Sequence, residues 1–131
     1  MSFERVLLAF FAAFVLLAGV ACLVAPANFA LQAGLSATPS GLTEIRAFYG
    51  GLQIGFGSFL FWCLRDRALT VAGLLLEMVG VGALGIARVL GMLIDRSPTG
   101  YHLTNLAVEV TTVALIAVAF ARRRRLAGRT A

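Results

Sequence analysis

Four long apolar runs, separated by short polar segments, divide the chain. They cover residues 6–25, 43–64, 68–94 and 102–121. Each is close to the roughly 20 apolar residues that cross a bilayer as an α-helix. The pattern predicts an all-α, polytopic membrane protein, with a single four-helix transmembrane bundle formed by residues 1–131.

The first run ends at Pro26 and contains no charged residue. It exceeds the 7–15 apolar residues of a typical signal peptide, so we expect a retained helix, with cleavage near Ala25 as the alternative. The linker 26–42 is rich in small residues and proline. Within it, we expect one interfacial turn of helix over residues 28–35, with Phe29 and Leu31 against the lipid headgroups.

The two linkers that precede the second and fourth runs resemble each other. Thr-Pro-Ser-Gly at 38–41 leads to Thr43, and Ser-Pro-Thr-Gly at 97–100 leads to Thr104. We interpret each as a turn followed by a threonine cap for the next helix. Shared turn chemistry explains the likeness more simply than a duplicated hairpin.

Composition supports the membrane assignment. Hydrophobic residues make up 60% of the chain and charged residues 13%, and the mean hydropathy is +0.94. Soluble domains are closer to half apolar and a quarter charged. These values exclude a soluble globular protein, a disordered chain and a nucleic-acid-binding module.

The positive charge is unevenly placed. All 11 basic residues are arginines, against 6 acidic residues. Eight of the arginines flank the apolar runs on what four spans would make one side of the membrane: Arg5, Arg65, Arg67, Arg122, Arg123, Arg124, Arg125 and Arg129. Because arginine excess marks the cytoplasmic side, we expect both termini to lie in the cytoplasm.

Glycines are concentrated in the second and third runs. Small residues let membrane helices approach closely, and Gly51 and Gly55 form a small-xxx-small step. We therefore predict helix packing at Gly50, Gly51, Gly55 and Gly80, and this role is favoured over close approach of a ligand.

Ionisable residues inside a span are expensive, and they mark either function or a compensated pair. At a rise of 1.5 Å per residue, Arg88 lies about 9 Å and Glu109 about 10 Å from the outer ends of their helices. Their equal depth and opposite sign predict an interhelical ion pair. Arg46, Tyr49 and Asn105 are expected in the same outer layer. This polar cluster is interpreted either as a site for a small molecule or ion, or as polar glue that fixes helix register.

Glu77 lies deeper, about 14 Å from the inner edge of its span. Its depth matches that of Gln53. A neutral Glu77 bonded to Gln53 is the structural interpretation, and a water-accessible Glu77 that relays protons is the functional one. Burial in hydrocarbon disfavours the charged carboxylate, so the neutral acid is the expected resting form.

No catalytic motif is present, so no catalytic residue, metal site or cofactor is predicted. Cys22 and Cys63 fall near opposite membrane faces, beyond the reach of a disulfide. Tyr101, His102 and Trp62 lie at span ends and are interpreted as interfacial anchors.

Residues 44–51, Glu-Ile-Arg-Ala-Phe-Tyr-Gly-Gly, begin the second run, and glycines follow them. With the chain length and the four runs, this stretch resembles domain-of-unknown-function family 4345, a family of small bacterial four-helix membrane proteins. The resemblance covers nearly the whole chain. It implies a location in the bacterial inner membrane, and it implies no activity.

Three functions stay open at this stage. The first is binding or transport of a small molecule or ion, in which a homo-oligomer encloses the path. The second is a structural or accessory membrane subunit, whose polar cluster only locks the helices. The third, a membrane enzyme acting on a lipid or quinone, is disfavoured because a nucleophile and a metal set are missing. The expected partners are the bilayer, an unidentified ligand and a second copy of the chain, with no nucleic acid.

Overall fold

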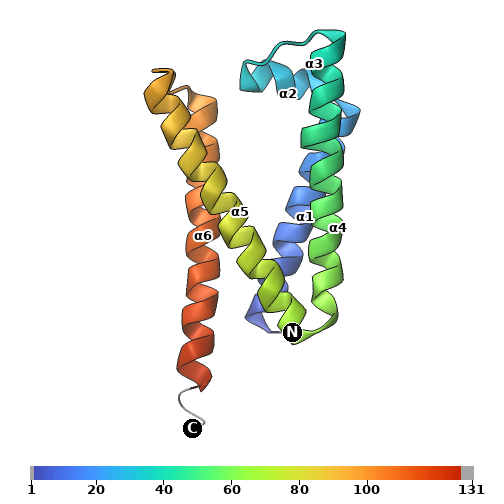
Figure 1. The fold of residues 1–131 in the computed structure, drawn as a ribbon. Helices are drawn as coiled ribbons and strands as arrows, with labels where there is room; N and C mark the ends of the chain where they lie inside the picture. Colours follow the sequence, from blue (N-terminus) through green and yellow to red (C-terminus); the bar gives the residue numbers. More distant parts are fainter. Residues whose placement is uncertain (1, 128–131) are drawn as a thin grey trace. The chain divides into compact units, whose positions relative to one another are not determined.

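The computed structural model describes residues 2–127, and these contain helices and turns without a strand (Figure 1). The elements, in chain order, are α1 (Phe3–Val24), α2 (Pro26–Ala33), α3 (Pro39–Glu44), the π-helix η1 (Ile45–Gly51), α4 (Leu52–Trp62), the 3₁₀ turn η2 (Cys63–Arg65), α5 (Arg67–Ile94) and α6 (Gly100–Ala127). Four helical stretches are long and apolar enough to cross a membrane: Phe3–Val24, Pro39–Arg65, Arg67–Ile94 and Gly100–Arg125. The all-α fold class with four spans is confirmed.

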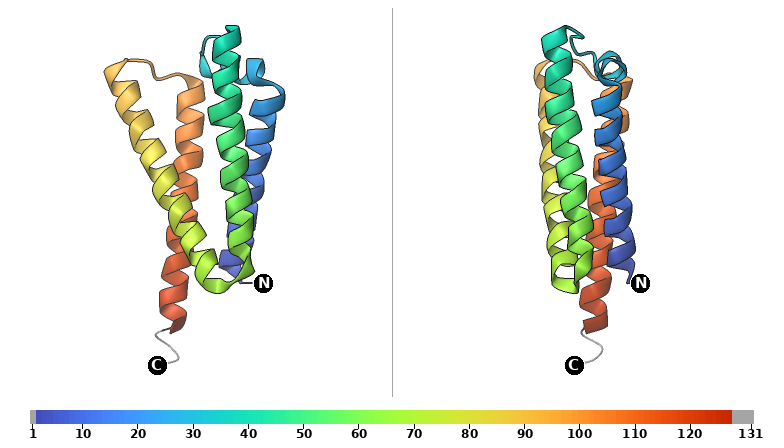
Figure 2. Two further views of the ribbon diagram at one scale, coloured as in Figure 1. Left: turned by 45° about the vertical axis from the view of Figure 1, so that its right-hand side comes forward. Right: turned by 90° about the vertical axis from the view of Figure 1, so that its right-hand side faces the viewer.

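The chain forms two compact units, and each is described by itself. The N-terminal unit comprises residues 5–73, and the C-terminal unit comprises residues 74–131 together with residues 1–4. Within the first unit α1 lies beside α4, and within the second α5 lies beside α6 (Figures 1 and 2). Assembly of all four spans into a single domain stays a prediction.

The helix predicted in the first linker is present as α2. Pro26 is its first residue, where the missing N–H removes no helical hydrogen bond, and Gly34 ends it with a positive φ of 69°. Leu31 is exposed, as expected for an interfacial residue. Phe29 differs from the expectation, because it packs inward on the buried residues Cys22, Ala30 and Ile45.

The predicted threonine caps were placed too late in the sequence. The hydroxyl of Thr38 accepts from the backbone N–H of Gly41 at 3.2 Å, so the helix begins at Pro39. Thr43 lies inside that helix and donates to the carbonyl of Pro39. In the second linker Thr99 accepts from the N–H of His102 at 3.4 Å, and Thr104 lies within α6. In the first linker, Pro39 at the first helical position carried the signal that moves the cap forward.

The second span contains an unexpected π-helix, Ile45–Gly51. Its hydrogen bonds run from residue i to residue i+5, and the N–H of Leu52 accordingly donates to the carbonyl of Ala47. Ile45 and Gly50 are both buried. Five residues turn an α-helix by about 140° from the starting face, whereas the wider π turn brings both residues toward one side.

Glycines allow α1 and the second span to meet backbone to backbone. A Cβ added at Gly57 would lie 2.9 Å from the backbone nitrogen of Leu16, and one at Gly19 would lie 2.8 Å from that of Ile54. At Gly50 the added atom would lie 3.2 Å from the Cα of Leu23. Such close approach replaces the hydrophobic drive that lipid removes.

The turn between the second and third spans is capped by its own side chains. Asp66 accepts from the N–H of Leu69 at 2.8 Å, and the hydroxyl of Thr70 donates to the carbonyls of Asp66 and Cys63. Arg5 donates to the carbonyl of Arg65 at 3.3 Å. The start of the first helix therefore lies beside this arginine-bearing turn.

In the C-terminal unit, the guanidinium of Arg122 lies 5.0 Å from the centre of the Phe3 ring, a cation–π contact. Arg129, counted with this cluster in the sequence, lies outside the described residues. The cytoplasmic location of the termini stays a prediction. Cys22 and Cys63 are free thiols, as expected.

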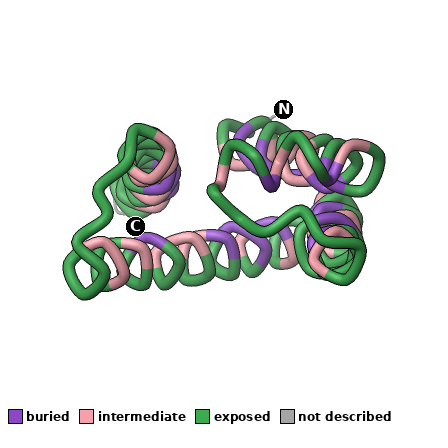
Figure 3. The backbone as a smooth tube through the Cα atoms, turned by 90° about the horizontal axis from the view of Figure 1, so that it is seen from above, coloured by how far each residue is buried: buried purple, intermediate pink, exposed green. Residues whose placement is uncertain are grey.

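Buried residues form a stripe along one side of α5 (Figure 3). They are Thr70, Gly73, Leu74, Glu77 and Gly85, at spacings of three, four and eight residues that fall on one helix face. On α6 the matching stripe is Glu109, Thr112, Ile116 and Ala119. Glu77 on α5 and the ion-paired Glu109 on α6 thus belong to the buried faces of their helices.

Candidate functional site

Arg88 of α5 and Glu109 of α6 form the ion pair that their equal depth predicts. Nε of Arg88 donates to both carboxylate oxygens of Glu109, at 2.9 and 3.1 Å, and Nη2 donates to Oε1 at 2.7 Å. The side chains are 17% and 7% exposed. A short, fork-shaped set of bonds at this burial compensates both charges inside a span.

Gly85 makes room for the pair, one helical turn before Arg88. A Cβ added there would lie 3.3 Å from Oε2 of Glu109. That separation is below ordinary van der Waals contact, so a side chain at this position would push the carboxylate away. The absence of a side chain at Gly85 therefore allows the Glu109 carboxylate to approach the backbone of α5.

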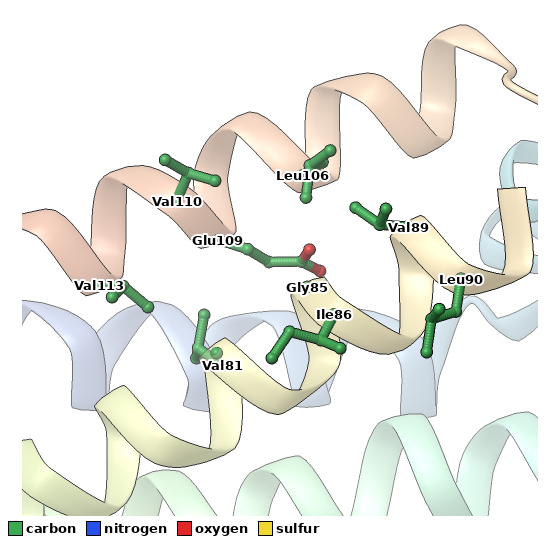
Figure 4. Close-up of a pocket in the computed structure, with 10 residues that line it drawn as sticks. Val81, Gly85, Ile86, Val89, Leu90, Leu106, Glu109, Val110 and Val113 are labelled. Carbon is green, nitrogen blue, oxygen red and sulfur yellow. The ribbon is translucent and has the colours of Figure 1, made fainter. Parts of the chain in front are cut away.

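An open groove of about 450 Å³ runs between α5 and α6 (Figure 4). Glu109 lies in its wall, and its other lining residues are aliphatic or glycine. From α5 these include Val81, Gly85, Ile86 and Val89, and from α6 Leu106, Val110 and Val113. A single carboxylate, paired with a cation outside the groove lining, is thus placed in the wall of an otherwise apolar groove.

A second, smaller space lies toward the turn that joins the two helices. Its volume is about 150 Å³. Four of its six lining residues have polar side chains, and the lining comprises Arg88, Gly91, Met92, Asp95, Ser97 and His102. Within the pair, Glu109 lines the apolar groove and Arg88 lines the polar pocket, so the ion pair stands between two chemically different spaces.

For the remaining residues of the predicted cluster, the contacts described lie within their own helix or unit. Asn105 donates to the carbonyl of Tyr101 on its own helix, at 2.8 Å. Arg46 and Tyr49 belong to the N-terminal unit, where Arg46 is exposed and the Tyr49 ring lies 4.5 Å from that of Phe29. Their proximity to Arg88 and Glu109 stays a prediction.

Glu77 is 2% exposed, and its Oε2 has no hydrogen-bond partner among residues 2–127. Gln53, its predicted partner, belongs to the N-terminal unit, where its Cβ faces Gly19 of α1. The bond between Glu77 and Gln53 therefore stays a prediction, as does the proton-relay role.

The four glycines predicted to pack helices have different surroundings. Gly50 meets Leu23, as described above. An added Cβ at Gly51 would come closest to the carbonyl oxygen of Arg46, at 3.7 Å on the same span. At Gly55 and Gly80 it would meet no atom within 4 Å in the described part of the chain. Packing at these two positions stays a prediction.

Sequence reasoning did not single out Gly85, Asp95, Ser97 or the pocket role of His102. Gly85 had a usable signal, because it precedes Arg88 by three residues and so shares its helix face. The polar pocket had none, since the chain reversal after α5 creates it. Across residues 2–127, no three His, Cys, Asp or Glu residues gather in a way that could hold a metal ion.

These features define a class: an α-helical, multi-pass membrane protein with an ion pair inside the membrane. The chain belongs to the family described as Domain of unknown function (DUF4345), whose model matches residues 3–120. Comparisons with curated proteins and with solved structures found no match.

Proposed function

We propose that this protein binds a small, neutral amphiphile from the membrane in the groove between α5 and α6. The observation that carries the proposal is the position of Glu109, a paired carboxylate in the wall of an apolar groove. The groove volume falls within the roughly 300–1,000 Å³ of small-molecule sites. Ionisable residues at membrane depth are functional candidates by default.

The charges and hydrogen bonds determine the chemistry of this ligand. Arg88 and Glu109 neutralise each other, so the site favours a ligand without net charge. The groove surface is almost wholly apolar, so apolar contact provides most of the binding. A hydroxyl on the ligand adds only a donor for the carboxylate, which accepts hydrogen bonds only. The aliphatic walls suit an alkyl chain or a hydrocarbon ring.

Photo-crosslinking tests the proposal with the full chain in nanodiscs. The probe is a long-chain alcohol that carries a diazirine in the middle of its chain. Labelling is expected to concentrate on the peptides that line the groove, because the probe resides there. Val110→Trp fills the groove and should remove most of that labelling. Val108→Trp is the matched control, since Val108 is an exposed valine of the same helix outside the groove lining.

Equal labelling along all lipid-facing surfaces would contradict the proposal. So would unchanged labelling of the groove in Val110→Trp. Both variants must retain the helical content and thermal unfolding temperature of the parent for the comparison to count.

A structural role is the second candidate, and a specific observation favours it as well. Three hydrogen bonds join Arg88 to Glu109, and Gly85 is shaped to receive the carboxylate. These hydrogen bonds and the close approach at Gly85 are sufficient by themselves to fix the register of α5 against α6. Under this role the groove is lined with ordinary bilayer lipid and shows no preference for the alcohol probe over bulk acyl chains.

A further inference from the structure

We propose that the polar pocket beside Arg88 is a binding site for a glycerol-like group that carries neighbouring hydroxyls. This site is distinct from the apolar groove, and the inference goes beyond the proposed function. It rests on the pocket lining, on one buried nitrogen atom and on the depth of the pocket.

The buried nitrogen is Nδ1 of His102. It is inaccessible to solvent and has no hydrogen-bond partner within residues 2–127. The backbone N–H of the same residue is satisfied by Thr99, and its ring lies 5.5 Å from the ring of Tyr101 in an edge-on arrangement. A buried nitrogen without a partner is unfavourable, and a turn of the imidazole ring that brings Nδ1 to the pocket would let a ligand supply that partner.

The lining favours a hydroxyl over other groups. Nδ1 of a neutral histidine either donates or accepts, according to the tautomer. A hydroxyl can do both, whereas a carbonyl only accepts and an ammonium only donates. Asp95 adds a pure acceptor and Ser97 a group of either kind. Several hydroxyls on one small molecule would engage these groups together.

The size and place of the pocket agree with a glycerol moiety. A volume of about 150 Å³ corresponds to about five water molecules at roughly 30 Å³ each. The pocket extends from Arg88 to the turn after Ile94, which spans about 9 Å of helix at the end of the third span. The end of a span is expected near the boundary between acyl chains and headgroups, where the glycerol backbone of a lipid lies. The hydroxyls can also come from free glycerol in the water phase.

The single histidine of the chain provides a direct readout. The full chain, purified with an affinity tag that lacks histidine, is labelled with ¹⁵N in its imidazole and placed in phosphatidylcholine nanodiscs. The Nδ1 chemical shift is followed during titration with 1-monooleoylglycerol, with methyl oleate and with free glycerol. Methyl oleate has a similar chain and no hydroxyl, so it controls for partition into the bilayer.

We expect a saturable Nδ1 shift with 1-monooleoylglycerol and none with methyl oleate. A saturable shift with free glycerol as well assigns the site to soluble polyols, and its absence assigns the site to lipids. Ser97→Ala should weaken the apparent affinity about fivefold, the effect of one hydrogen bond. Thr104→Val is the control, because Thr104 lies on α6 like His102 but outside the pocket lining, and it should leave the affinity unchanged.

Two results would overturn the inference. One is an Nδ1 chemical shift that changes with neither 1-monooleoylglycerol nor free glycerol. That result means that the pocket holds water only. The other is an equal shift with methyl oleate, which means that the signal reports bilayer composition. Neither result bears on the groove, because the crosslinking experiment tests the groove with a different readout.

Discussion

Oε2 of Glu109 lies 3.3 Å from the position that a Cβ on Gly85 would occupy. The carboxylate of the ion pair between the last two spans therefore occupies space that a side chain at residue 85 would partly fill. Gly85→Ala gains up to about 1 kcal/mol of helix propensity, but it must displace a carboxylate held by three hydrogen bonds. We expect a net loss of about 1–2 kcal/mol, in the range of overpacked sites. Reversible unfolding in detergent measures it.

Gly80→Ala is the control for that change, because it lies on the same helix and its added methyl group would meet no atom of the described residues within 4 Å. It should be neutral or stabilising by up to about 1 kcal/mol. If both variants behave alike, the contact between Gly85 and Glu109 has no energetic weight.

Arg88→Met and Glu109→Leu should each destabilise the protein by about 3–5 kcal/mol, because each leaves one buried charge unpaired. The double variant should lose less than the sum of the two, since no charge then remains. A double-mutant cycle that combines the unfolding free energies gives the coupling. In the control cycle Arg96→Met replaces Arg88→Met, and its effects should add within about 0.5 kcal/mol. Additive losses for Arg88 and Glu109 would show that the pair is energetically silent.

Gly57→Ala should separate α1 from α4. The added methyl carbon would lie 2.9 Å from the backbone nitrogen of Leu16 and 3.0 Å from the carbonyl oxygen of Ala12, and backbone atoms cannot rotate away. We expect a loss of about 1–3 kcal/mol, measured by thermal unfolding of the full chain. Gly55→Ala, two residues earlier with open space around it, should cost nothing. Equal effects of the two variants would contradict the packing described for these helices.

Glu77→Gln should change the unfolding free energy by less than about 1 kcal/mol, because glutamine has the shape of the neutral acid and can still hydrogen-bond. Glu77→Lys should destabilise strongly, since a cation at a site that is 2% exposed requires a partner. The two variants are compared by unfolding in detergent. A large loss in Glu77→Gln, similar to that in Glu77→Lys, would indicate an ionised and paired carboxylate instead.

Arg96 has a φ of 51°, in the left-handed region, and it lies in the turn between α5 and α6. Arg96→Gly removes the steric strain of a Cβ there and should stabilise the protein by up to about 1 kcal/mol. Arg96→Ala keeps the strain while removing the charge, so it should show no gain. A gain in both variants would assign the effect to charge.

The sequence was sufficient for the spans and for the pairing of Arg88 with Glu109. Both predictions use the 1.5 Å rise per residue of the α-helix. The rise converts the length of an apolar run into a span, and the position of a residue within the run into a depth. Apolar length and proline positions then fix where each helix begins and ends, within a few residues. The early cap at Thr38 was readable too, had Pro39 been treated as the first helical residue. Pro98 lies before the cap at Thr99 and gives no such signal.

Other features depend on contacts that a linear pattern does not encode. The inward position of Phe29 arises because α2 folds back onto the residues around Cys22 and Ile45. The polar pocket requires the chain reversal after Ile94, which brings His102 toward Asp95 and Arg88. Depth counting also assumes that every turn is an α-turn, and Ile45–Gly51 breaks that assumption.

The π-helix has a consequence for any attempt to read faces from residue numbers in the second span. A helical wheel drawn with 100° per residue from Pro39 to Arg65 loses phase across Ile45–Gly51. Positions before and after this segment must be projected on two separate wheels. The buried face of the second segment, which carries Gly57 and Leu60, therefore cannot be inferred from the residue numbers that precede Ile45.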